Sequence, residues 1–231
     1  SGWSPPLTVT IIGNTSSCTD VELSGSPSQK IDVTFIPNYY SESDLTQFSE
    51  DVQTTISDIL YYHPFSSKTD LFNFHRVDVV NLRDSDPLGE NEARAYASLC
   101  PTDQMIVIYN NWNFPGGLGM DGAAVVNRQI NNQWPVLTPH EFGHSFGNLN
   151  DEGNLNRVPI WPERNCSSSK NNPPWKGYPG TITIEGCRID KGWFRSSLNS
   201  MMNDPDEFIT DPNGFKPWNI KLLTDKLNQY R

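Results

Sequence analysis

Runs of alternating or continuous apolar residues recur along the first half of the chain and predict β-strands. Turn-forming residues bound these runs, and β-branched and aromatic residues dominate them. The run at 104–110 is almost wholly apolar, which is typical of a central strand that is covered on both faces. We expect strands at residues 7–12, 31–36, 74–82, 104–110 and 123–127.

Apolar residues at helical spacing predict two helices outside the motif discussed below. In the first, Ser43 is the expected N-cap and Pro64 ends the helix. In the second, at 218–230, one face carries three apolar residues. The residues that define these two faces are Leu45, Phe48, Val52, Ile56, Ile59 and Leu60, and then Ile220, Leu223 and Leu227.

The order of these elements predicts an α/β fold with a twisted mixed sheet, a motif helix and a C-terminal helix. The turn-rich segment SGSPSQ separates the first two strands. We therefore expect residues 1–30 to form an N-terminal strand or appendage packed on a main domain of residues 31–231. Residues 153–192 lack periodicity, so they form either a functional loop or one held by a disulfide bond.

Cysteine number and charge narrow the class of protein. Four cysteines without C-x-x-C spacing suit two disulfides, with four buried free thiols as the alternative. Three pairings are possible, and Cys166 with Cys187 is the favoured pair, which leaves Cys18 with Cys100. We therefore expect a secreted protein. The net charge of −10 disfavours nucleic acid and anionic membranes as partners and favours basic substrates. No apolar run is long enough to span a bilayer, and we expect a monomer.

The segment HEFGHSFGNLNDE, residues 140–152, carries the clearest chemistry. On a helix, His140 and His144 share one face and can bind one zinc ion, while Glu141 can accept a proton from water bound to that ion. Thr138 as N-cap and Pro139 at the first helical position would begin this helix, which would also make Glu141 part of a capping box. Capping accounts for the glutamate but not for the two histidines, so we favour the catalytic role.

A third ligand is expected just after the helix. Gly147 can end the helix and turn the chain back toward the metal. Asn150 and Asp151 are both in reach, and a carboxylate is the better zinc ligand, so we favour Asp151. Glu152 is another candidate for the third ligand, or it holds a ligand histidine in position without contacting the metal.

The motif and several other segments resemble the IgA-peptidase family of zinc metallopeptidases, a metzincin-like group. That family's motif reads approximately HEFGHSFAGLADEY, and the similar segments here include IDVTFIPNYYSESDLTQF, PFSSKTDLFNFHRVDV, QMIVIYNN and EGCRIDKGWFRSSLNSMMND. The resemblance implies a metzincin-like zinc peptidase domain, with Asp151 as third ligand and Met202 in the Met-turn beneath the metal. Met201 is the alternative. The family resemblance also implies cleavage of extracellular proteins or glycoproteins.

Other candidate residues surround the motif. The glycine turn and the following strand, with Gly117, Gly119, Ala124 and Val125, either bind an extended peptide by strand addition or form an ordinary turn and strand. The function expected is a zinc endopeptidase acting on protein or peptide substrates. The alternatives are an inactive metal-containing module that binds peptide or glycan, and a structural module without metal.

Two further side chains are candidates for stabilising an oxyanion. These are Tyr178 and Arg195, for which packing or surface roles are the alternative. His63 and His75 lie near no motif, so we expect them to be structural.

Overall fold

The computed structural model describes residues 17–84, 92–113, 116–129, 134–153 and 155–230. Its main element is a six-stranded sheet with the strand order β1-β3-β2-β4-β6-β5. The strands are β1 (Cys18–Glu22), β2 (Ile31–Asn38), β3 (Phe72–Val77), β4 (Gln104–Tyr109), β5 (Gly117–Met120) and β6 (Ala123–Asn127). The strand expected at 7–12 lies outside the described residues.

The sheet is mixed, as the sequence predicts. The four inner strands, β3, β2, β4 and β6, are parallel, while β1 and β5 run antiparallel at the two edges. Strand β4 is central and fully buried, so that prediction is confirmed. The strand expected at 74–82 instead spans Phe72–Val77. Strand β1 joins the sheet by pairing with β3, and the division at residue 30 stays a prediction.

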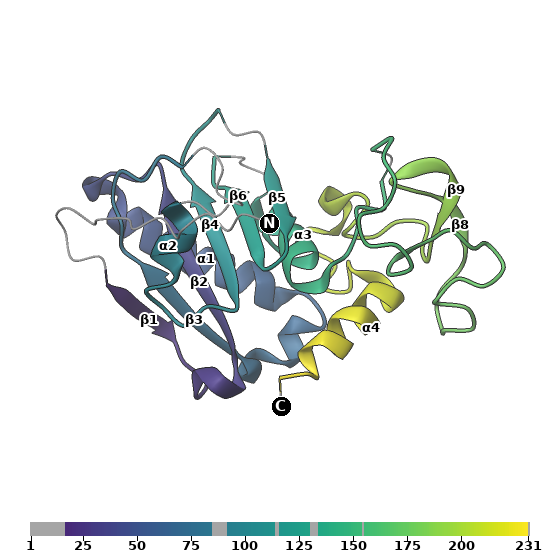
Figure 1. Ribbon diagram of the computed structural model, residues 1–231, viewed down its shortest axis with the longest axis horizontal. Coiled ribbons are helices and arrows are strands. Elements are labelled where there is room, and N and C mark those ends of the chain that lie inside the picture. The colour runs from purple at the N-terminus through teal and green to yellow at the C-terminus, as the bar shows by residue number, and fades with distance from the viewer. Residues whose placement is uncertain (1–16, 85–91, 114–115, 130–133, 154, 231) are drawn as a thin grey trace, which may run out of the picture.

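Helices cover both faces of this sheet (Figure 1). On one face lie α1 (Leu45–Tyr61), α3 (Trp134–Gly147) and α4 (Lys216–Leu227), and on the other lies α2 (Glu92–Ala97). Alternate residues of each inner strand point to opposite faces. In β4, Ile106 therefore packs in the core with α1 and α3, and Val107 in the core with α2.

The two helices predicted from apolar spacing are present. Helix α1 begins at Leu45, but Ser43 does not cap it. A short 3-10 turn precedes the helix, and the reciprocal side-chain cap of that turn joins Ser41 to Asp44. Helix α4 buries Leu223 and Leu227, as expected. The 3-10 helices are Pro27–Gln29, Glu42–Asp44, Phe65–Ser67, Thr69–Leu71 and Pro205–Phe208.

The aperiodic segment 153–192 contributes most of a second, three-stranded sheet. Its strands are β7 (Cys166–Ser167), β8 (Ile184–Cys187) and β9 (Ile189–Arg195), in the order β7-β9-β8. The disulfides Cys166–Cys187 and Cys18–Cys100 are both formed, as the sequence predicts. Helix α3 lies between the large sheet and the region that carries β8 and β9 (Figure 1). Among the described residues, no helix is long and apolar enough to cross a membrane.

Candidate metal centre

Helix α3 carries the HExxH residues, but it begins earlier than the sequence predicts. It starts at Trp134, so Thr138 is not its N-cap and Pro139 lies inside it. Pro135 occupies the first turn, where a missing N–H group costs nothing. Glu141 therefore lies two turns into the helix and cannot form a capping box, so that explanation of Glu141 is wrong.

The helix brings His140 and His144 together. Their Nε2 atoms are 3.1 Å apart, and Asp151 Oδ1 lies 3.2 Å from Nε2 of His140 and 3.1 Å from Nε2 of His144. Phe142 and Phe146 point the other way, into the main core. Three potential ligand atoms thus form a nearly equilateral triangle on one side of α3.

Backbone carbonyl groups orient both imidazole rings. His140 Nδ1–H donates to the carbonyl oxygen of Met201 at 2.8 Å, and His144 Nδ1–H donates to that of Leu149 at 2.6 Å. A carbonyl oxygen can only accept, so these bonds place the proton on Nδ1 of each ring. The two Nε2 atoms are thereby directed at a common point, as in metal sites whose histidines are held from outside.

Glu141 lies beside this triangle and is almost completely buried. His140, Glu141 and His144 form a group whose ligand atoms all lie within 4.8 Å of one another, and this group could hold a metal ion. Burial raises the pKa of Glu141, while the nearby imidazoles of His140 and His144 oppose that rise. The carboxyl group is therefore more basic than an exposed glutamate, as a general base should be.

His140 and Asp151, which both belong to the triangle, stabilise one another's charge. Burial disfavours the imidazolium of His140, but its hydrogen bond with Asp151 and the charges of Glu141 and Asp151 outweigh burial and raise its pKa to about 9. Burial likewise disfavours the carboxylate of Asp151, yet hydrogen bonds from both histidines hold its pKa far below the usual range. A metal ion at this position would compete with protons for the same atoms.

Of the candidates for third ligand, only Asp151 faces the histidines. The side-chain oxygen of Asn150 accepts hydrogen bonds from the backbone N–H groups of Ile160, at 2.8 Å, and Trp161, at 3.1 Å. Its amide nitrogen donates to the carbonyl oxygen of Trp161 at 2.7 Å. Asn150 is therefore committed to holding the neighbouring loop.

Glu152 holds other parts of the fold together and contacts no ligand histidine. Its buried carboxylate accepts hydrogen bonds from Ser200 Oγ at 2.6 Å, Asn219 Nδ2 at 3.0 Å and Asn165 Nδ2 at 3.2 Å. Burial raises the pKa of Glu152, and these three donors oppose the rise. The residue thus joins the end of the motif to the turn at Ser200, to α4 and to the segment before Cys166.

The two methionines of the expected Met-turn lie directly beneath α3, and both are fully buried. A Cβ atom added at Gly143 would lie only 2.9 Å from Met202 Sδ, so the sulfur packs against the helix between the two histidines. Met201 contributes the carbonyl oxygen that orients His140. The backbone N–H of Glu152 donates to the carbonyl oxygen of Met202 at 2.6 Å.

The edge strand β5 passes directly over the motif helix because it carries glycines. A Cβ atom at Gly117 would lie 2.5 Å from Glu141 Oε1, and one at Gly119 would lie 2.2 Å from the backbone oxygen of Glu141. A larger residue at Gly119 would displace the strand or the helix, and one at Gly117 would displace the side chain of Glu141. Gly117 and Gly119 therefore border the site, and their role in peptide binding stays a prediction.

Ala124 and Val125, which were also predicted to contact peptide by strand addition, lie on an inner strand of the sheet. Ala124 and Val125 belong to β6, which is hydrogen-bonded to β4 on one side and to β5 on the other. Both side chains are buried. The prediction of peptide contacts at Ala124 and Val125 is therefore wrong, because β5 is the edge strand.

Tyr178 and Arg195 are both occupied elsewhere. The ring of Tyr178 packs edge-on against Trp218, with ring centroids 5.4 Å apart. The guanidinium of Arg195 donates to four backbone carbonyls, those of Glu152, Gly186, Ser197 and Leu198. Neither residue lines the cavity at the histidines, so the structure gives no support to the predicted oxyanion role of either.

A cavity of about 240 Å³ opens above the histidines, Glu141 and Asp151. Strand β5 forms one wall, and four residues of the segment 153–192 also line it. No periodic pattern or motif in the sequence marks these four residues, so they could not be predicted. They are Arg157, Ile160, Trp161 and Arg188.

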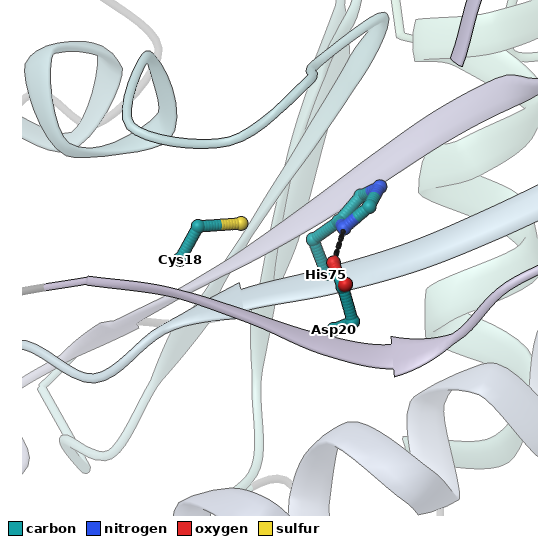
Figure 2. A group of neighbouring side chains, drawn as sticks. All are labelled: Cys18, Asp20 and His75. Carbon is teal, nitrogen blue, oxygen red and sulfur yellow. Dashed lines mark hydrogen bonds and ion pairs between the residues drawn. The ribbon is translucent and has the colours of Figure 1, made fainter. Parts of the chain in front are cut away.

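A second group of polar side chains lies at the opposite edge of the sheet, on β1 and β3 (Figure 2). His75 Nδ1 lies 2.8 Å from Asp20 Oδ1, and its Nε2 lies 2.9 Å from Asp32 Oδ1. Cys18 is bonded to Cys100, so it offers no thiolate to a metal. This group links three strands, in agreement with the structural role expected for His75.

A scan of protein-family models finds none that matches this chain, and a search of curated proteins finds no match either. The resemblance to the IgA-peptidase family stays a prediction that rests on the residues quoted above.

Proposed function

We propose that this chain is a zinc-dependent endopeptidase with His140, His144 and Asp151 as metal ligands and Glu141 as general base. The observation that carries the proposal is the triangle of two imidazole nitrogens and one carboxylate oxygen, with sides of 3.1–3.2 Å. A buried glutamate adjoins that triangle.

The donor set suits zinc. Nitrogen and oxygen donors lie about 2.0–2.1 Å from a tetrahedral zinc ion, which puts them roughly 3.3 Å from one another. The observed separations of 3.1–3.2 Å need only a small adjustment to reach this value. Three protein ligands with a fourth position left open are typical of catalytic rather than structural zinc sites.

When bound, zinc would lower the pKa of water from about 15.7 to roughly 7 and polarise the scissile carbonyl. Glu141 accepts the proton of the attacking water and then donates it to the leaving amine. The carbonyl groups of Met201 and Leu149 keep the two imidazoles in the tautomer that leaves Nε2 free. Burial of Glu141 strengthens its basicity.

The substrate is a peptide in extended conformation that lies along β5. In the part of the chain that the structure describes, this strand pairs only with β6, so its other side is a sheet edge beside the cavity. Main-chain hydrogen bonds between an edge strand and an extended peptide are a general mode of peptide binding. The two disulfides and the family resemblance favour a secreted protein that acts on extracellular proteins or glycoproteins.

The decisive test is Glu141→Gln, with Glu50→Gln as the matched control on the exposed surface of α1. Both variants should retain about one zinc per chain by mass spectrometry. Cleavage of a mixed peptide library should fall at least 1000-fold in Glu141→Gln only. Full activity of Glu141→Gln would refute the assigned base. A wild-type protein that binds zinc and peptide but cleaves nothing would instead be an inactive binding module.

A further inference from the structure

The cavity over the candidate metal centre is lined by two arginines, Arg157 and Arg188. Both come from the segment 153–192, whereas the histidines and Glu141 come from α3. The overall charge of the chain is −10 and favours basic substrates, but the arginines give this wall of the cavity a positive charge. The local charge decides which groups can bind there, because interactions beyond about 10 Å are largely screened by salt.

The side chain of Arg188 is buried and has no partner among the described residues. The residue is 6% exposed, and its Nε atom is buried without a hydrogen bond. Among the described residues, no carboxylate oxygen lies within 4.0 Å of its guanidinium. A buried guanidinium ordinarily requires a charged or hydrogen-bonded partner, so its unfilled donors point to a ligand.

Three other partly buried arginines, Arg128, Arg76 and Arg195, have partners among the described residues. Arg128 Nε lies 2.6 Å from Asp51 Oδ2, and Arg76 Nε lies 3.0 Å from Asp78 Oδ1. Arg195 donates four hydrogen bonds to backbone carbonyls. Unlike these three arginines, Arg188 has no side-chain partner among the described residues, and it lines the cavity.

The backbone holds Arg188 firmly in this place. The residue lies between β8 and β9, next to the disulfide-bonded Cys187, with φ of 60°. Its carbonyl oxygen accepts hydrogen bonds from the backbone N–H groups of Leu155, at 2.9 Å, and Arg157, at 3.1 Å. The left-handed conformation favours glycine, yet an arginine stands here. The same two hydrogen bonds also fix the loop that carries the second arginine.

We propose that Arg188, assisted by Arg157, binds a carboxylate group of the substrate next to the cleaved bond. A planar guanidinium matches a carboxylate through two parallel hydrogen bonds, which a neutral amide cannot reproduce. The carboxylate belongs either to an aspartate or glutamate side chain, as endopeptidase action requires, or to the C-terminus of the peptide, in which case the enzyme cleaves at the chain end. This inference rests on the proposed peptidase function and names its substrate class.

The first test compares cleavage of matched peptides. Internally quenched peptides with an amidated C-terminus carry Glu or Gln at each position near the cleaved bond, and a third set has a free C-terminal carboxylate. We expect at least a 10-fold higher kcat/KM for the best carboxylate-bearing peptide over its neutral partner. Preference for Glu assigns the side chain, and preference for the free terminus assigns the chain end.

Arginine variants show which residue sets this preference. In Arg188→Gln the ratio should fall toward one, and in Arg157→Gln, where the residue is exposed, it should fall severalfold. Arg83→Gln, an exposed arginine that stacks on Tyr39, is the control and should keep the full ratio. A wild-type ratio of one for every peptide pair, or a ratio unchanged in both Arg188→Gln and Arg157→Gln, overturns the proposal.

A binding measurement separates this proposal from the peptidase function itself. Calorimetric titration of Glu141→Gln with the same peptides measures affinity without turnover. The carboxylate-bearing peptide should bind about 10-fold more tightly than its neutral partner, and adding Arg188→Gln should remove the difference. Arginine-dependent binding without cleavage by the wild type would support the carboxylate site and refute the peptidase. Equal binding and equal cleavage of both peptides would do the reverse.

Discussion

Replacement of Gly119 by alanine tests whether the edge strand is seated against the motif helix. The added Cβ atom would lie 2.2 Å from the backbone oxygen of Glu141 and 2.8 Å from Cβ of His144. Ordinary Cβ contacts are 3.4–4 Å, so the strand and the helix must separate by about 1.2 Å. Neither contact is the end of a flexible side chain that could move aside.

The cost of that separation can be estimated from the elements involved. Helix α3 is held by the main core and by the bonds to both histidines, so β5 is the element that moves. Overpacking alone costs about 1–3 kcal/mol, and weakened pairing with β6 adds to it. We expect about 3 kcal/mol, which for a chain of this size lowers the Tm by roughly 6–12 °C.

The assay is thermal unfolding followed by circular dichroism in the presence of a chelator, so that metal binding does not mask the change. Gly25→Ala is the matched control, because the Cβ there meets only the flexible side chain of Lys30. We expect the control to unfold within about 2 °C of the wild type. Gly119→Ala unfolding within the same range would refute the close approach of β5 to α3.

Three further changes have expected outcomes. Burial raises the pKa of Asp58 to about 7. Because the folded protein favours the protonated carboxyl group, the free energy of unfolding is highest below about pH 4 and decreases as pH rises through 7. Asp58→Asn should therefore stabilise the protein by about 2 kcal/mol at pH 8 and not at pH 4, allowing for partial exposure; equal urea midpoint shifts at both pH values would contradict this. Glu152→Gln puts an amide N–H₂ among three donors and should lower the free energy of unfolding by about 2–3 kcal/mol, measured in urea at pH 7, where an unchanged value would show that the carboxylate is dispensable. Cys18→Ser with Cys100→Ser opens a bridge between residues 82 apart and should cost about 4 kcal/mol in the same assay, and a loss below 1 kcal/mol would exclude a persistent bridge.

Apolar patterns predicted the elements whose burial they encode. Strands β4 and β6 and helix α1 lie where those patterns place them, because each buries a continuous run or face. The start of α3 was missed because Thr138 and Pro139 imitate a helix start, whereas the helix continues from Trp134. Residues such as Thr138 and Pro139 are compatible with a helix start, but tertiary packing determines where the helix begins.

The candidate metal ligands were more predictable than their surroundings. Helical spacing alone brings His140 and His144 together, and donor chemistry favours Asp151. Neighbour order in a sheet is not encoded in periodicity, so Ala124 and Val125 were wrongly given to the edge. Arg188 lines the cavity because of the path of a long connection that the Cys166–Cys187 disulfide holds. No local sequence pattern encodes that path.

The most direct test of the central claim is the zinc K-edge X-ray absorption spectrum of the purified protein loaded with one equivalent of zinc. We expect two imidazole nitrogens and additional oxygen donors at about 2.0–2.1 Å, with no sulfur at about 2.3 Å. The same spectrum of Asp151→Asn should change its oxygen shell. A protein that retains no zinc after dialysis, or a spectrum with fewer than two imidazoles, would contradict the account.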